Sequence, residues 1–111
     1  MQDKDYKKLG FALMEAKEEI KKYINYEDGG SCNLDSPLVK LERVNPDKLR
    51  KLNEDFEVNV HSVRGSSWWK GFFYLGIPLS GQGFRRTKMA EVIRDVLERN
   101  GFQAAVYYCM D

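Results

Sequence analysis

The sequence predicts an α+β fold, with helices packed against one antiparallel sheet. Apolar residues recur every three or four positions near both ends of the chain, as in amphipathic helices, and alternate with polar residues in the middle, as in strands. Short segments rich in Gly, Pro and Asn separate these stretches. The chain has 111 residues, of which 42% are hydrophobic, and this is enough for one domain with one core.

The first predicted element is a long amphipathic helix over residues 3–26, which Asp28-Gly29-Gly30 ends. A loop over 31–37 and a loosely alternating strand over 38–44 follow. Asn45 is a good N-cap and Pro46 suits the first position of a helix, so a short second helix begins there. The apolar stripe of the first helix comprises Tyr6, Leu9, Leu13, Ala16, Ile20 and Tyr23.

Two strands are predicted in the middle of the chain. Residues 56–63 alternate between apolar and polar, and residues 68–77 are apolar on both faces, as in a central strand. A second long helix follows over 86–100 and ends at Gly101. A closing strand covers residues 104–109.

The order after the first helix is therefore β-α-β-β-α-β, the ferredoxin-like pattern, whose antiparallel sheet has its first and third strands in the centre. The chain is expected to form a single domain over 1–111, with its core in 36–111. The N-terminal helix, 1–28, is an addition that is expected to pack on the open face of the sheet. The residues expected to be buried are Leu13, Ile20, Val58, Val60, Phe73, Leu75, Met89, Ile93, Val96 and Val106.

Composition argues against a membrane or secreted protein. No stretch approaches the roughly 20 apolar residues of a membrane span, and the charged N-terminus lacks the apolar segment of a signal peptide. The two cysteines, Cys32 and Cys109, are too few for a disulfide framework. We therefore expect a soluble, cytoplasmic protein with free thiols.

Charge is distributed unevenly along the chain. The net charge is only +1, but residues 64–110 carry 7 Lys/Arg against 3 Asp/Glu. No acidic residue occurs between Glu57 and Glu91, and this run contains five Lys/Arg, the only histidine and six aromatic residues. The run predicts a basic, aromatic surface that binds an anionic partner.

The first candidate site within this run is the segment from Gly81 to Lys88. Gly81 and Gly83 form a loop that feeds a helix N-terminus, where free N–H groups and the helix dipole favour anions. Arg85, Arg86 and Lys88 gather there although the dipole disfavours cations, which indicates an anionic partner. Replacing the two arginines is expected to weaken partner binding without loss of stability. A turn with solvated charges is the alternative interpretation.

The second candidate is Trp68-Trp69-Lys70. Adjacent residues of a strand face opposite sides of a sheet, so one tryptophan is expected in the core and the other at the surface beside Lys70. An exposed tryptophan there suits base stacking or a protein contact. In the alternative interpretation, both tryptophans cap the core.

The stretch from Lys70 to Leu75 also resembles part of the signature that RNA-recognition motifs carry on their third strand. Phe73 stands where that signature has Gly or Ala, and Ile77 stands where it has an aromatic residue. The first strand, over residues 38–42, offers no stacking aromatic. An RNA-recognition motif therefore stays an alternative.

Catalytic and metal-binding patterns are weak. Cys32, His61 and Asp35 supply a nucleophile, a base and an acidic residue that could orient the base, but their spacing does not show that they meet. One histidine and two distant cysteines make a poor ligand set for a metal. We expect no catalysis, no metal and no cofactor, and a small cysteine-dependent enzyme is the least favoured alternative.

Three stretches, 31–37, 81–91 and 107–111, together resemble small uncharacterised proteins encoded in phages and mobile elements of Firmicutes. The resemblance implies a context, because small single-domain phage proteins often act by binding. Anti-CRISPR and other anti-defence inhibitors are examples, and some of them have a ferredoxin-like fold. The resemblance transfers no catalytic residue.

The sequence thus predicts a non-enzymatic binding protein, of an anti-CRISPR-like or other inhibitor kind, that engages host nucleic acid or a nucleic-acid-handling protein. The alternative is a module that binds a nucleotide or phosphate at the loop of Gly81 to Lys88. The expected partner-binding residues are Trp68, Trp69, Lys70, Gly81, Gly83, Arg85, Arg86 and Lys88.

Overall fold

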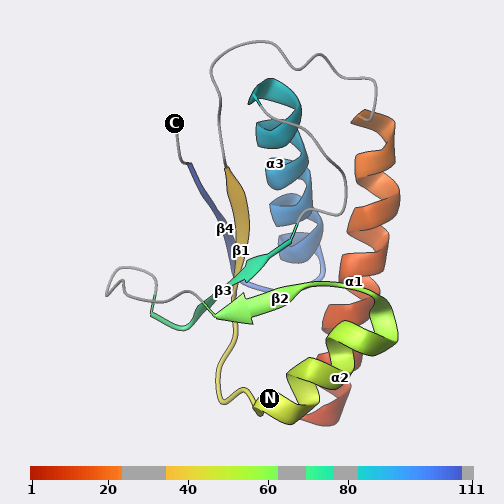
Figure 1. Ribbon diagram of the computed structural model, residues 1–111, viewed down its shortest axis with the longest axis vertical. Helices are drawn as coiled ribbons and strands as arrows, with labels where there is room; N and C mark the ends of the chain where they lie inside the picture. The colour runs from red at the N-terminus through yellow and green to blue at the C-terminus, as the bar shows by residue number, and fades with distance from the viewer. Residues whose placement is uncertain (24–34, 63–69, 77–82, 109–111) are drawn as a thin grey trace.

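The computed structural model describes residues 1–23, 35–62, 70–76 and 83–108 (Figure 1). This part of the chain confirms the predicted α+β class. Its helices are α1 (Asp3–Ile20), α2 (Pro46–Phe56) and α3 (Gly83–Arg99), with a short 3-10 helix, η1 (Lys21–Tyr23), after α1. Its strands are β1 (Ser36–Lys40), β2 (Val60–Ser62), β3 (Phe72–Leu75) and β4 (Ala104–Tyr107).

The four strands form one antiparallel sheet in the order β2-β3-β1-β4, so β1 and β3 lie in the centre. The central place of β3 agrees with its predicted apolar character. The register places Leu38 of β1 between Tyr74 of β3 and Ala105 of β4. At the edge of the sheet, Val60 of β2 lies opposite Leu75 of β3.

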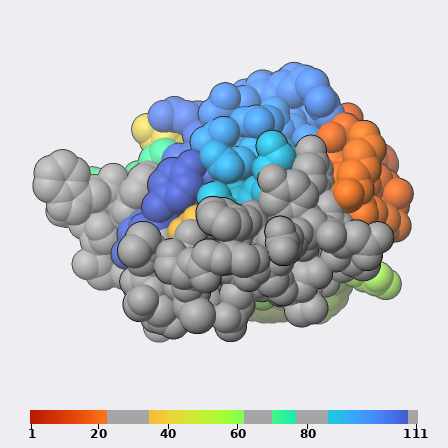
Figure 2. All heavy atoms as spheres, turned by 90° about the horizontal axis from the view of Figure 1, so that it is seen from above, coloured from red at the N-terminus to blue at the C-terminus, as the bar shows by residue number. Residues whose placement is uncertain are grey.

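The N-terminal helix packs on the side of the sheet opposite to the expected one. Both α1 and α3 lie side by side on one face of the sheet, and α2 lies against the N-terminal part of α1 (Figure 1). Seen from above, α3 lies between β4 and α1 (Figure 2). The expectation that α1 covers the open face is therefore wrong. The physical reason is that the apolar stripe of α1 fills the same core as the stripe of α3.

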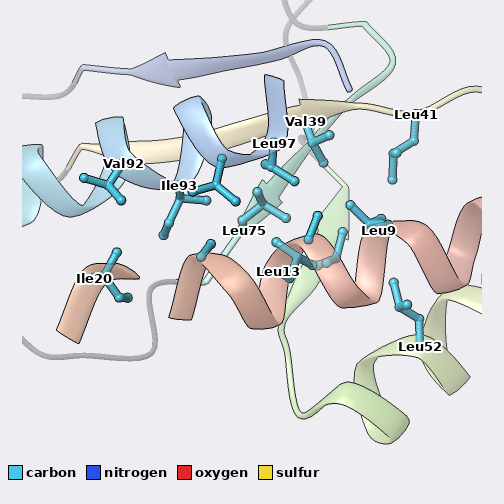
Figure 3. Packing of buried hydrophobic residues seen from close by; sticks show 14 of the residues in the cluster. Leu9, Leu13, Ile20, Val39, Leu41, Leu52, Leu75, Val92, Ile93 and Leu97 are labelled. Atoms are coloured by element: carbon cyan, nitrogen blue, oxygen red, sulfur yellow. The ribbon is translucent and has the colours of Figure 1, made fainter. Parts of the chain in front are cut away.

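The hydrophobic core lies between these two helices and the sheet. Leu9 and Leu13 of α1 point toward Val39 and Leu75 of the sheet and toward Leu97 of α3 (Figure 3). Most residues predicted to be buried are buried, but Val58 and Phe73 are only half-buried and pack at the rim of the cluster. Leu49 and Leu52 of α2 join the same core, so it extends from the sheet through α1 to α2.

The strand predicted from residue 56 begins only at Val60, because α2 continues through Phe56. Phe56 continues the helical spacing of Leu49 and Leu52, and its ring packs directly on the bare backbone of Gly10 in α1. A left-handed residue, Glu57 with φ 52°, then ends the helix. The glycine that is a weak point in an isolated helix is the place where α2 docks on α1.

Asn53 fixes the turn from α2 into β2. Its side-chain amide donates to the Val60 carbonyl at 3.1 Å, and its side-chain oxygen accepts the Val60 N–H at 3.0 Å. The backbone carbonyl of Asn53 also accepts the Val58 N–H at 3.1 Å. At the other end of α2, the Asn45 side chain caps the helix as predicted, accepting from the N–H groups of Asp47 and Lys48.

The remaining boundaries differ by a few residues. Regular α-helix ends at Ile20 where the sequence predicts 26, and β1 covers 36–40 where the sequence predicts 38–44. The strand predicted over 68–77 is β3, over 72–75, and α3 begins at Gly83, three residues before the expected start. None of the described helices is both long and apolar enough to cross a membrane.

Candidate nucleic-acid interface

The structure describes some of the predicted partner-binding residues in full, some by their backbone alone and some not at all. Trp68, Trp69 and Gly81 lie outside the described residues, as do Cys32 and Cys109. Gly83 begins α3, and the structure describes only the backbone of that residue and of Arg85. The side chain of Lys70 is exposed, and those of Arg86 and Lys88 are half-buried.

Arg86 connects α3 to the start of β1. Its Nε donates to the Asp35 carbonyl at 2.7 Å, and a terminal guanidinium nitrogen lies 3.5 Å from the Ser36 hydroxyl. The next residue, Thr87, donates its hydroxyl to the Asp35 carboxylate at 2.5 Å. Asp35 itself is 1% exposed. Arg86 therefore supports the fold, and we expect its replacement to lower stability, contrary to the sequence-based expectation.

Lys70 and Arg86 lie at opposite ends of β1. The carbonyl of Gly71, beside Lys70, accepts the N–H of Leu41 at 2.9 Å, just beyond the C-terminal end of β1. Arg86 binds the other end of the strand, at Asp35 and Ser36. With a rise of about 3.3 Å per residue, these ends are about 13 Å apart or more. The structure thus places Lys70 and Arg86 at separate points of the sheet.

A different surface stands out on the face of the sheet that none of the described helices covers. Side chains alternate along each strand, so Val39, Val60 and Leu75 face the helices and their neighbours face away. The residues that face away are Leu38 and Lys40 of β1, His61 of β2, Phe72 and Tyr74 of β3, and Ala105 and Tyr107 of β4. We call this set the open face.

Three rings on the open face form a row across the sheet. The His61 ring lies 5.5 Å from the Tyr74 ring, at an angle of 34°. The Tyr74 ring lies 6.5 Å from the Tyr107 ring in an edge-on arrangement. Because β3 and β4 are two strand spacings apart, about 9.5 Å, the two tyrosines lean toward each other over β1. Leu38 lies between their strands and is fully buried.

Positive charge lies beside this row, at the C-terminal end of β1. Lys40 is opposite Phe72 in the register and shares the open face with it. Lys70 follows directly in space, because the turn at Gly71 places the two chain segments side by side. Gly71 has φ 83°, a conformation that glycine adopts without strain. The four described strands carry no Asp or Glu, and Lys40 and Lys70 are cations at this end of β1.

Tyr108 marks the boundary of the aromatic row. It follows Tyr107 directly, is also exposed, and donates its hydroxyl to Glu91 of α3 at 3.2 Å. It therefore points to the helix side of the sheet. Partial desolvation and then the Glu91 carboxylate raise the pKa of the Tyr108 phenol. Its different direction makes Tyr108 a natural control for Tyr107 and Tyr74.

The structure does not bring the candidate acid and base together. The Asp35 carboxylate binds Thr87 on the helix side, whereas His61 contacts Tyr74 on the open face. The sheet separates the two side chains. Within the described ranges, no group of three or more His, Cys, Asp and Glu residues is placed to hold a metal ion.

A cleft of about 320 Å³ opens between α1 and the β2–β3 edge of the sheet. Its walls are mainly apolar, from Leu13, Val60, Leu75 and Ile93, and Lys17 lies at its border. No described residue of the segment from 81 to 88 lines it. The cleft therefore gives no support to a nucleotide or phosphate site at that loop.

Comparison with known proteins gives no indication of function, so the open face is the basis of the functional proposal. No protein-family model matches the chain, and neither the curated proteins nor the solved structures give a significant match.

Proposed function

We propose that the protein is a non-enzymatic binding protein that takes up single-stranded nucleic acid across the open face of its sheet. The observation that carries the proposal is the row of His61, Tyr74 and Tyr107, whose rings contact one another across the strands. Rings displayed side by side on a sheet stack on successive bases. Single strands are the preferred target, because the bases of a duplex are already stacked on each other.

The charges support the same partner. Lys40 and Lys70 lie beside the aromatic row, at the C-terminal end of β1, where they would contact the phosphates of a strand whose bases stack on the rings. Trp68 and Trp69 directly precede Lys70 in the sequence and stay predicted to extend this surface. Arg85 and Lys88 stay predicted contacts for an anionic partner at the start of α3.

The likeness to the RNA-recognition signature gains support from the direction of the side chains. Phe72 and Tyr74 lie on the open face, where that motif displays its stacking rings. Phe73, which departs from the signature, faces the helices and packs against the core. The first strand still lacks an aromatic residue, and His61 and Tyr107 of the edge strands supply rings in its place.

We further infer a ferredoxin-like sheet. The order β2-β3-β1-β4 has the first and third strands in the centre, and the chain order is β-α-β-β-α-β after α1. One feature is altered, because α1 lies beside α3 on the sheet and α2, which connects β1 to β2, lies against α1.

The phage and mobile-element context remains part of the proposal. A small protein that sequesters a single strand would inhibit a nucleic-acid-handling enzyme of the host without any chemistry of its own. Its partner would then be the guide or displaced strand on which such an enzyme depends.

Replacing Tyr74 with leucine tests the proposal. Leucine keeps apolar cover over Leu38 but loses the ring, and stacking is worth about 1–3 kcal/mol per base. We therefore expect the affinity for a short labelled single-stranded RNA to fall about tenfold or more. Fluorescence anisotropy titrations of both proteins measure it, with single-stranded DNA and duplex RNA as parallel probes.

Two variants serve as controls. Tyr74→Phe keeps the ring and should bind like the wild type, and Tyr108→Leu removes a ring that faces α3 and should also leave binding unchanged. Lys40→Ala with Lys70→Ala should reduce the salt dependence, by about 0.7 in the slope of log K against log salt for each phosphate that is no longer neutralised. Equal binding by wild type and Tyr74→Leu, or a preference for duplex, would contradict the proposal and favour a protein partner.

A further inference from the structure

The outward face of α1 carries a second surface, separate from the open face of the sheet. Phe11 is 63% exposed and Met14 is 47% exposed, although both lie in the middle of the helix. They lie opposite the buried stripe of Leu9 and Leu13. Apolar side chains of this size on the solvent side of a helix indicate a contact with another molecule.

Phe56 of α2 extends this apolar surface. Its ring meets the Phe11 ring edge-on, with 5.4 Å between the ring centres. Hollows of about 380 and 460 Å³ lie on either side of Phe56, and charged residues such as Lys7, Lys51 and Glu18 border them. An apolar centre with a charged rim is the usual anatomy of a protein–protein interface.

The charges along the same face are ordered. Lys4 and Lys7 precede Phe11, and Glu15 and Glu18 follow it, all of them exposed. These four residues have cations toward the N-terminus and anions toward the C-terminus, the reverse of what the helix dipole favours, whereas Asp3 and Asp5 in the first turn and Lys17 in the last turn follow the dipole. An antiparallel helix with the same order would offset both charge groups at once.

We propose that two copies of the chain pair through this face, with α1 antiparallel to α1 of the second copy and Phe11 at the two-fold axis. A two-fold axis at residue 11 places position 15 opposite position 7, and position 18 opposite position 4. Lys7 then meets Glu15 of the second copy, and Lys4 meets Glu18. A parallel pairing would instead place like charges together.

Both acidic residues of this face have partners within the chain and keep an acceptor for the pairing. Lys21 binds Oε1 of Glu18 at 2.7 Å, so Oε2 would accept from Lys4 of the second copy. Arg99 and Asn100 both bind Oε2 of Glu15, at 2.9 and 3.1 Å, so Oε1 can accept from a lysine of the second copy. The Arg99 hydrogen bond also lowers the pKa of Glu15, which keeps the carboxylate ionised. In Figure 2, α3 lies between β4 and α1, so α1 is on the side of the molecule away from β4. Pairing through α1 therefore leaves the sheet of each copy accessible.

A charge-swap experiment tests the pairing. One variant, Lys4→Glu with Lys7→Glu, makes the face acidic, and the other, Glu15→Lys with Glu18→Lys, makes it basic. We expect the wild type to form dimers in sedimentation velocity at rising protein concentration, each variant alone to dissociate at least about tenfold more readily, and the mixture to form one-to-one heterodimers. Melting curves confirm that both variants are folded.

Phe11→Ala provides an independent variant, because it removes the central contact without changing charge; its dimer should weaken at least about tenfold. A wild type that stays monomeric at every concentration, or variants that fail to recover association when mixed, would overturn the pairing. Binding of single-stranded RNA per subunit should be the same in Phe11→Ala as in the wild type, because this change alters no charge. A failure of the dimer thus leaves the nucleic-acid proposal untouched, and the reverse also holds.

Discussion

Replacing Leu9 with alanine should lower the free energy of unfolding by about 2–5 kcal/mol. Leu9 is fully buried where α1 faces Val39 of the sheet and Leu97 of α3, and Leu52 of α2 approaches it from the other side (Figure 3). Truncation therefore removes contacts with the sheet, α3 and α2 and leaves a cavity among them. Chemical denaturation monitored by circular dichroism measures the change.

The conservative variant Leu9→Met keeps most of the volume and should cost less than about 1.5 kcal/mol. If Leu9→Ala lowered the stability by only a few tenths of a kcal/mol, α1 would be a peripheral addition to the sheet. A large decrease would instead show that the sheet depends on α1 for its cover.

The second large effect is expected at Asp35. Its buried carboxylate accepts the Thr87 hydroxyl, and a hydrogen bond to a charged group contributes about 1.5–3 kcal/mol. We expect Asp35→Ala to destabilise the protein by about that amount, because the Thr87 hydroxyl loses this acceptor. The change loosens the junction between the first turns of α3 and the start of β1.

A double-mutant cycle with Thr87→Val isolates this hydrogen bond. Residues that interact directly show coupling energies of about 0.5–3 kcal/mol, so the double variant should be more stable than the sum of the two single changes implies. Strict additivity would show that the carboxylate and the hydroxyl do not depend on each other. Asp35→Asn, which retains an acceptor oxygen of similar shape, should be less destabilising than Asp35→Ala.

Most of the fold could be predicted because its helices and strands differ in hydrophobic period. The stripes of α1 and α3, the cap at Asn45 and the antiparallel strands all follow from local pattern and residue type. The end of α2 could not be read in this way, because Phe56 fits both the helical spacing of Leu52 and the alternation toward Val58. A contact distant in sequence, the packing of Phe56 on Gly10, decides between the two.

The site was harder to predict than the fold. The acid-free run drew attention to Arg86, but the backbone carbonyl of a buried residue 51 positions earlier in the chain, Asp35, holds that guanidinium, and spacing gives no sign of such a pair. The aromatic row joins His61, Tyr74 and Tyr107 from three strands, and the sequence predicts the central strands but not the register that brings these rings together. The one local signal was the alternation of Phe72 and Tyr74 against Phe73, which separates the open face from the core.

The two hydrogen bonds between the Asn53 side chain and Val60 also prevent strands of other copies of the chain from pairing with β2. Val60 forms a pair with Leu75 in which its N–H and carbonyl point away from β3, as the adjacent bond from Gly76 to Asn59 shows. At the outer edge of β2 these two groups would be a template for a strand from another molecule. The Asn53 side-chain amide forms hydrogen bonds with both of these groups, as a fifth strand would. Its loss would open a route to edge-to-edge aggregation that does not pass through unfolding.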